Sequence, residues 1–410
     1  MPALALALLA VLGGAALVVD RLALDNAKQE LRTAAEAAAL AAARELASDD
    51  RLRTDFDPAA LRMKSRFAAA RIAIENVIAG EALTLNTDPR GDVRFGQPRV
   101  DPETGETIFV EAEGHEDSTS VVVHARRTSD RDSAVPLPMR MLYAPTDADV
   151  AAVAEASINF GVIGLRPVDE LRIPTLPLAI LSQAVVKQDS TSEKSPATRD
   201  SRSTAGQTTK PQPPSAASWV RDIEQRHGTD RFGYDASTGE VTQTSDGIPE
   251  ITLRTAARSA DPKSNAFVLA LTGDMTQDRL HRHICDGWSA DDLQPLGGEL
   301  LFGHGPLNLA GLRGVDSNVL CGALRKVIGQ PRVVFLYDRE LGDTRASVAS
   351  LHISKMVAGR VMSVRELSNG ECEIVFQPAV LATRSAVTLS DESESGSEKN
   401  KYVANLRLTN

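Results

Sequence analysis

The sequence predicts an α+β fold in which an N-terminal transmembrane helix continues into an Ala-rich helical stalk and is followed by a mixed soluble α+β region. Three observations predict it. Residues 3–19 are apolar and uncharged, residues 20–47 consist mostly of strong helix formers, and short β-branched runs alternate with helical patterns through most of the remaining chain. A chain of 410 residues also has room for about two or three domains.

Changes in composition divide the chain into six expected segments. They are a transmembrane anchor over 1–19, an Ala-rich helical stalk over 20–50, a first soluble α+β region over 51–186, a disordered linker or insertion over 187–218, a second, strand-rich α+β region over 219–382 and an acidic tail over 383–410. The linker prediction rests on residues 187–217, which lack large apolar side chains and so cannot bury enough surface to offset the entropy lost on ordering.

Charge and cysteine content exclude some classes of protein. The formal net charge is -10 and the isoelectric point is about 5.3, which argues against nucleic-acid binding because such proteins usually carry a basic face. The cysteines, Cys285, Cys321 and Cys372, lie far apart, so a disulfide framework is not expected. Free, buried thiols are the favoured interpretation. One disulfide, formed in an oxidising compartment, is the alternative.

The first apolar segment is just long enough to cross a bilayer. At about 1.5 Å per residue, residues 3–19 form a helix of about 26 Å. A cleaved signal peptide is the rival interpretation, but no basic residue precedes the segment and no clean Ala-x-Ala site closes it before Asp20. We therefore expect an uncleaved, single-pass anchor that holds the protein in the cell membrane through residues 3–19, with the soluble region outside the cytoplasm.

The stalk carries a stripe of mainly small side chains at helical spacing. Its candidate partner-binding residues are Leu31, Ala34, Ala38, Ala41 and Ala42. Small side chains allow helices to approach closely, so the stripe fits packing against a partner protein or a second copy of the chain. The alternative, that alanine only supplies helix propensity, has equal weight because the stripe lacks heptads of larger residues.

The first soluble region contains several short motifs. A second amphipathic helix is expected over 67–79, and the motif D-V-x-F-G begins at Asp92. Two strands over 107–112 and 120–125 are expected to form a hairpin-like pair across a polar turn region. The second strand ends in A-R-R-T and leads to a P-L-P exit over 136–138.

The rest of the chain is expected to be a mixed α/β region. Residues 173–180 are rich in proline and predict an extended segment or an edge strand. Apolar and β-branched runs predict strands over 250–254, 266–271, 332–337, 347–353, 357–364 and 373–377, and helical patterns predict helices over 277–286 and 317–328. Residues 402–408 fit one further short strand in the tail.

Several motifs, taken in order, resemble one bacterial family. They are the Val19-Asp20 junction, the pattern E-L-x-x-A-A-E-A-A-A-L-A-A-A over 30–43, the D-V-x-F-G motif and the A-R-R-T motif. Together they resemble TadG-like proteins of the tight-adherence (Flp) pilus assembly system. The resemblance covers most of the chain outside residues 187–217 and the tail.

The resemblance implies a non-enzymatic, membrane-anchored envelope protein without a cofactor. Its implied role is that of a structural or assembly component of a Flp pilus or a related secretion system. The implied partners are other pilus-assembly or envelope proteins, or further copies of the chain, and not nucleic acid. The alternative is a secreted or periplasmic hydrolase or binding protein with a cleaved signal peptide.

One cluster has the residue types of a metal site without its spacing. His281, His283 and Cys285 are potential zinc ligands. On the predicted helix, however, His281 and Cys285 share a face that excludes His283, and no fourth ligand lies nearby at motif spacing. We therefore predict no metal site there.

Two further stretches are explained by local structure. The glycines from Gly297 to Gly314 match neither phosphate-loop nor dinucleotide-loop spacing, and turns that need a positive φ explain the Gly-His-Gly-Pro segment over 303–306 better. The pair Asp291-Asp292 fits a helix cap or a solvated turn. No catalytic, cofactor-binding or metal-binding residue is predicted.

Overall fold

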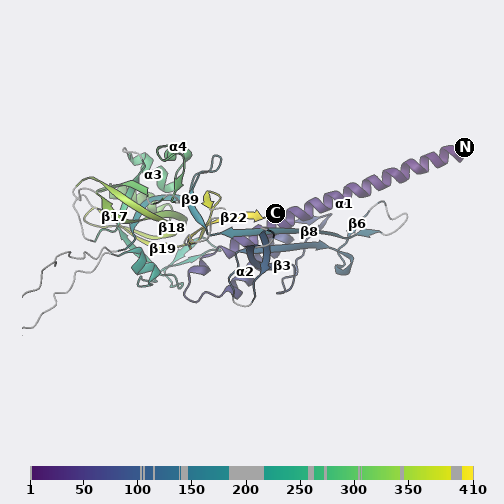
Figure 1. Ribbon diagram of the computed structural model, residues 1–410, viewed down its shortest axis with the longest axis horizontal. Helices are drawn as coiled ribbons and strands as arrows, with labels where there is room; N and C mark the ends of the chain where they lie inside the picture. Colours follow the sequence, from purple (N-terminus) through teal and green to yellow (C-terminus); the bar gives the residue numbers. More distant parts are fainter. Residues whose placement is uncertain are drawn as a thin grey trace, which may run out of the picture. The chain divides into compact units, whose positions relative to one another are not determined.

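The computed structural model divides the chain into two compact units (Figure 1). The first unit is Met1–Val168 with Ala379–Asn410, and the second is Asp169–Pro378. The residues that the structure describes are 2–101, 104, 107–113, 116–137, 139, 146–183, 217–256, 263–271, 275–302, 305, 307–341, 346–388 and 399–409. Most of the predicted linker over 187–218 and much of the predicted acidic tail lie outside these residues.

The first unit packs a long helix on one face of a six-stranded sheet. Helix α1 is Pro2–Leu46, and α2 (Pro58–Ile74) packs beside it. The sheet has the order β20-β22-β8-β5-β3-β4, with bounds β3 Val93–Val100, β4 Thr107–Glu111, β5 Ser120–Arg127, β8 Val150–Asn159, β20 Leu381–Ala382 and β22 Val403–Thr409. Strand β22 confirms the short strand predicted near the C-terminus.

Smaller elements complete this unit. They are η1 Asp49–Leu52, η2 Ser129–Arg131, and the short pairs β1 Val77–Ile78 with β2 Glu81–Ala82, β6 Val135–Pro136 with β7 Asp147–Ala148, and β9 Val162–Leu165 with β21 Ala386–Thr388. Helix α2 starts and ends earlier than the helix predicted over 67–79, whose last residues lie in the turn and strand around β1. Its start is fixed by Asp57, whose side chain accepts from Ala59 N, and by Pro58 in the first turn.

The predicted hairpin between residues 107–112 and 120–125 is wrong. Strands β4 and β5 both form, but each pairs with β3, which lies between them. Gly96 permits the close β3–β4 approach, because a Cβ there would lie 2.1 Å from the Val110 carbonyl oxygen and 2.7 Å from the Phe109 ring. The local pattern located the strands but not their order.

The second unit is built on a seven-stranded sheet, of which five strands close into a barrel. The barrel strands are β10 Thr175–Leu181, β14 Ala266–Ala270, β16 Leu307–Leu312, β17 Pro331–Leu341 and β18 Val348–Glu366. Because β18 pairs with both β16 and β17, it closes the ring, and β19 (Cys372–Pro378) and β13 (Ile251–Arg254) extend the sheet from it. The strands predicted over 347–353 and 357–364 are therefore one long strand.

Helices and short strands cover this barrel. They are α3 Gln277–Cys285, α4 Ala290–Leu293, α5 Ser317–Arg325, the π-helix η4 Val220–Glu224, the 3-10 helix η5 Gln294–Leu296, and the strands β11 Gly233–Asp235, β12 Glu240–Thr242 and β15 Leu300–Leu301. Helices α3 and α5 confirm the helices predicted over 277–286 and 317–328. In the Gly-His-Gly-Pro segment the structure describes Gly305, which has the positive φ that the predicted turn needs.

Strand β10 confirms that most of residues 173–180 are extended, but the alternative of an edge strand is wrong. It lies between β14 and β17 and is buried almost throughout. The register of β10 against β17 shifts between Thr175 and Ala179. Pro177 lies within this irregularity, where its nitrogen, which has no hydrogen to donate, does not interrupt a regular ladder of hydrogen bonds.

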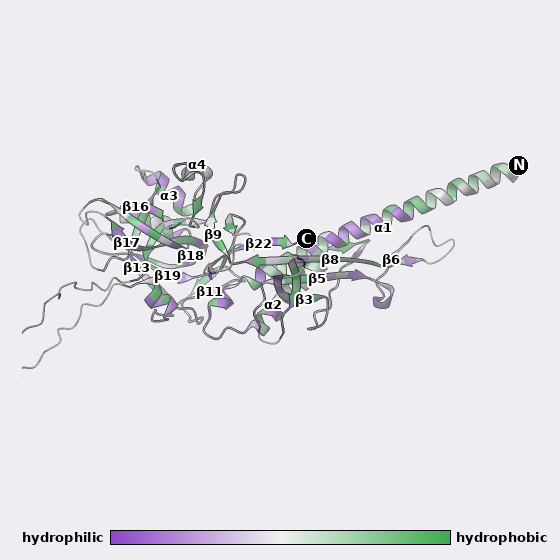
Figure 2. Ribbon diagram, in the orientation of Figure 1, coloured by the Kyte–Doolittle hydropathy of each residue, from purple (hydrophilic) through white to green (hydrophobic). Residues whose placement is uncertain are grey.

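The first half of α1 projects from its own unit and exposes apolar side chains, which Figure 2 shows as a largely hydrophobic stretch. Leu4, Leu8, Val11 and Leu12 are all more than half exposed. Among the residues whose side chains the structure describes, which leave out 1, 5, 6, 9 and 10, no helix has an apolar stretch long enough to cross a membrane. The transmembrane anchor over 1–19 stays a prediction.

Candidate functional site

The small-residue stripe of α1 lies in the core of the first unit. Leu31, Ala34, Ala38 and Ala42 have no exposed surface, and Ala41 is half-buried. Leu31, Ala34, Ala38 and Ala42, without Ala41, pack in one cluster with alternate residues of β5 and β8 and with the buried face of α2. The stripe thus contacts the sheet and second helix of its own chain, and a role in binding a partner stays an untested prediction.

Ala38→Leu is expected to lower the free energy of unfolding by about 2 kcal/mol, because the added carbons have no space between α1 and the sheet. Ala37→Leu, one position away on the half-exposed side of the helix, is the matched control and should change it little. Urea unfolding followed by far-UV circular dichroism measures both. Equal effects of the two substitutions would contradict the tight packing of this face.

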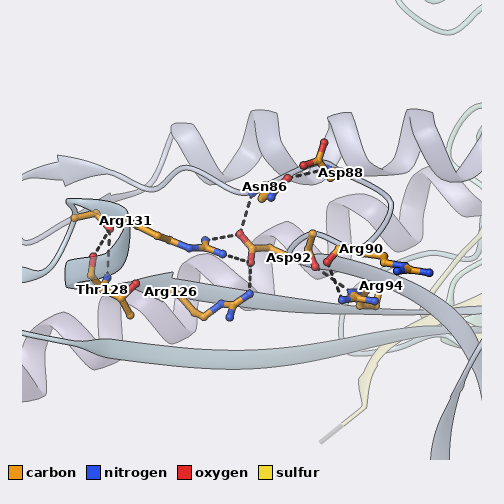
Figure 3. A network of polar contacts seen from close by, with 10 residues as sticks. Asn86, Asp88, Arg90, Asp92, Arg94, Arg126, Thr128 and Arg131 are labelled. Atoms are coloured by element: carbon orange, nitrogen blue, oxygen red, sulfur yellow. Dashed lines mark hydrogen bonds and ion pairs between the residues drawn. The ribbon is translucent and has the colours of Figure 1, made fainter.

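A buried carboxylate joins the D-V-x-F-G and A-R-R-T motifs (Figure 3). The Asp92 side chain has no exposed surface and accepts four hydrogen bonds. Arg131 donates to both of its oxygens, at 2.6 and 2.9 Å, and Arg126 donates to Oδ1 at 2.7 Å. The backbone N–H of Asn86 donates to Oδ2 at 2.9 Å. The contact holds the start of β3 against the end of β5.

The electrostatics of this carboxylate follow from two opposing effects. Burial alone would raise the pKa of Asp92, because it penalises the charged form. The hydrogen bonds from Arg131, Asn86 N–H and Arg126 favour the charged form and outweigh burial, so the pKa of Asp92 is lowered. The same contact raises the pKa of Arg131. Asp92 is therefore a charged, fully engaged acceptor at neutral pH.

The other arginine of A-R-R-T supports a tight turn. The Arg127 side chain is almost completely buried and donates to the Ile78 carbonyl oxygen, to the Glu81 carboxylate and, at 2.7 Å, to the Ser133 carbonyl oxygen. The turn between β1 and β2 has positive φ at Ala79 and Gly80, the geometry of the tightest hairpins.

Helix α1 contacts the same turn. The backbone N–H of Ala79 donates to Glu30 Oε2 at 2.9 Å. Glu30 is the first residue of the Ala-rich pattern over 30–43. Nearer the N-terminus of α1, Asp20 is buried. Its Oδ1 accepts a hydrogen bond from the backbone N–H of Met139, next to the P-L-P exit, at 3.0 Å. The motifs quoted from the sequence are thus joined by polar contacts around α1.

Helix α1, which some of these contacts involve, is the part of the chain that is similar to a known family. Residues 1–45, which nearly coincide with α1, match a family model. The model is that of the Tad family, described as putative Flp pilus-assembly TadE/G-like. The resemblance to this family, inferred from the motifs, is confirmed for this segment. No curated protein and no solved structure matches the chain.

Outside the matched segment, the second unit contains the histidine cluster. As predicted, His281 and Cys285 share one face of α3, with Nε2 and Sγ 3.7 Å apart, and His283 lies elsewhere. His283 is buried, with Nε2 3.1 Å from Asp292 Oδ1, and burial lowers its pKa. Within the described part of the chain, no group of three or more His, Cys, Asp or Glu side chains could hold a metal ion.

Asp292 confirms the capping interpretation. Its carboxylate accepts from the Ser289 backbone and side chain, while its own N–H donates to the Ser289 hydroxyl, which forms a capping box at the start of α4. These hydrogen bonds lower the pKa of Asp292 although its burial acts in the opposite direction. The acid stabilises a helix start.

The interpretation of the cysteines as free thiols is wrong for two of them. Cys321 of α5 and Cys372 at the start of β19 form a disulfide with Cα atoms 6.0 Å apart, and Cys285 is free. The sequence left one disulfide open as an alternative but could not identify its members, which lie 51 residues apart. A structural disulfide fits a region outside the cytoplasm.

Proposed function

We propose that the protein is a non-enzymatic, membrane-anchored component of a tight-adherence (Flp) pilus assembly or related secretion system, and that it acts as a structural or assembly protein. The observation that carries this proposal is the Tad family match over residues 1–45. The matched helix is also the element against which the sheet of the first unit packs.

The proposal gives the two halves of α1 different tasks. Residues 3–19, among which Leu4, Leu8 and Val11 are exposed, hold the chain to the cell membrane, and residues 27–46 contribute to the core of the first unit. The disulfide supports a soluble region outside the cytoplasm, as expected for an envelope protein. The partners proposed are other pilus-assembly or envelope proteins, or further copies of this chain.

A deletion strain of the encoding organism tests this role. Loss of surface pili in electron micrographs, restored by the wild-type gene, is the expected result. A matched variant in which residues 1–19 are replaced by a cleavable signal peptide should yield exported, soluble protein that does not restore pili. Unchanged piliation in the deletion strain would refute the proposed role.

Cell fractionation and mass measurement separate the proposal from its alternative. The anchored protein should be recovered from membranes at its full mass. Recovery from the soluble fraction, with a mass short of about the first twenty residues, would instead indicate a cleaved signal peptide.

A further inference from the structure

The first unit contains a groove that its structural role does not explain. It has a volume of about 900 Å³ and lies at one end of the sheet, where β3, β8 and β22 meet the chain around η1. A cavity of this size is in the usual range of ligand sites. All of its lining residues belong to the first unit, so the site is complete within that unit.

The lining is strongly basic in a chain whose net charge is negative. Four of its cations, Arg99, Lys399, Lys401 and Arg407, are exposed and have no ion pair with any described residue. The only carboxylate among the described lining residues, Asp117, is already used, because Arg51 Nη1 donates to its Oδ2 at 2.6 Å. The free positive charge of the groove therefore favours an anionic ligand.

Aromatic rings lie beside this charge. The guanidinium of Arg51 lies 5.9 Å from the centre of the Phe56 ring and 5.3 Å from that of Phe160, and both rings line the groove. Arg51 also donates to the Ser118 carbonyl oxygen at 2.7 Å, so its position is fixed. The two rings provide apolar surface next to the free cations.

Neutral hydrogen-bonding side chains complete the lining. Gln97 on β3 and Asn159 at the end of β8 present amide groups that are each used in part, because Gln97 Nε2 donates to the Asp117 carbonyl oxygen at 2.8 Å and Asn159 Oδ1 accepts from the Gly161 N–H at 2.6 Å. Ser157 and Thr409 present hydroxyl groups whose oxygens lie 2.8 Å apart. Amides and hydroxyls both donate and accept, which suits ligand groups that do the same. Sugar hydroxyls have this property, whereas carboxylates only accept.

We propose that this groove binds an acidic polysaccharide. The free cations would pair with its acidic groups, the amide and hydroxyl side chains with its hydroxyls, and the Phe56 and Phe160 rings with the C–H faces of its sugar rings. An acidic peptide would use the cations but leave most of the remaining lining unmatched. The disulfide fits a protein outside the cytoplasm, where envelope polysaccharides lie.

Binding of fluorescently labelled oligogalacturonate to the purified full-length chain tests the proposal. Fluorescence anisotropy should show binding that weakens with added salt, and no comparable binding of uncharged dextran oligomers. Replacing the four cations together, Arg99→Gln, Lys399→Gln, Lys401→Gln and Arg407→Gln, should weaken binding by about tenfold or more, because each exposed pair contributes modestly and four are lost.

The matched control removes the same charge elsewhere on the surface. Its substitutions are Lys28→Gln, Arg71→Gln, Arg325→Gln and Arg384→Gln, all at exposed positions outside the groove. This variant should bind oligogalacturonate like the wild-type chain. Circular dichroism of both variants shows whether either has lost its fold.

The remaining outcomes decide between ligands. Phe56→Leu should weaken oligogalacturonate binding about threefold, as expected for loss of one ring contact, without affecting binding of polyglutamate. Polyglutamate that binds as tightly as oligogalacturonate would identify an acidic protein segment as the occupant and overturn the proposal. No binding of oligogalacturonate, or equal binding by the groove variant, would also overturn it. None of these results depends on the role in pilus assembly.

Discussion

Asp92→Asn is expected to lower the free energy of unfolding of the first unit by about 3 kcal/mol. The substitution removes the negative charge that Arg126 and Arg131 share and puts an amide, with two donors, where four donors now converge on one carboxylate. Both arginines are partly exposed and can be hydrated, which keeps the loss below that of a fully buried pair. Urea unfolding followed by far-UV circular dichroism measures the change.

The stability lost in Asp92→Asn should depend on pH. Because the folded-state pKa of Asp92 is lowered below the unfolded value of about 3.9, its contribution is present above that pH and is lost as the pH falls through the folded-state pKa. The difference in stability between wild type and Asp92→Asn should therefore shrink below about pH 4.

Asp88→Asn is the control, since Asp88 lies four positions earlier in the same loop and is exposed. It should leave stability nearly unchanged at all pH values. A difference between wild type and Asp92→Asn that persists undiminished at pH 3, or an equal loss in the Asp88 variant, would contradict a stabilising charge on Asp92.

Local patterns predicted two helices and several long strands of the second unit, but not the barrel strand β16. Helix α3 begins at the residue expected, because Thr276 caps it and the apolar residues Leu280 and Ile284 recur four positions apart. Strands β14 and β19 lie within one residue of their predicted bounds, since both are short apolar runs with no helical period. Such signals are contained in a few consecutive residues.

The order of the strands could not be predicted in this way. The closure of the barrel depends on β18 pairing with β16 and β17 at once, and the placement of β3 between β4 and β5 depends on contacts across a loop. These pairings join distant residues, and the alternation of apolar and polar side chains is the same for any neighbour.

The polar contacts of the first unit could not be predicted either, because they also join residues that are far apart in the sequence. The motifs containing Asp92 and Arg126 were both identified, but they lie 34 residues apart and nothing local says that they meet. Asp20 and Met139 are 119 residues apart. The small-residue stripe of α1 was interpreted as a candidate partner-binding face, and the sequence could not say that the chain's own sheet would contact most of it.

Removing the disulfide by Cys321→Ser with Cys372→Ser is expected to lower the free energy of unfolding of the second unit by about 4 kcal/mol. The bridge joins α5 to β19 across a separation of 51 residues, and in the chain-entropy model a loop of that length restricts the unfolded state by this amount. Trp219 and Trp288, the two tryptophans of the chain, are both buried in this unit, so their fluorescence reports its unfolding in urea.

Cys285→Ser is the matched control, because it removes the free thiol and leaves the bridge intact. Its midpoint in urea should stay close to that of the wild type, and it should still fall when dithiothreitol is added. The double variant should be insensitive to dithiothreitol, since it has no bridge to reduce. The double substitution and the reduction by dithiothreitol remove the same covalent link between α5 and β19, which restricts the conformations of the unfolded chain. If reduction left the wild-type midpoint unchanged, this linkage would not be what stabilises the unit, and the packing of α5 against β18 and β19 alone would hold it in place.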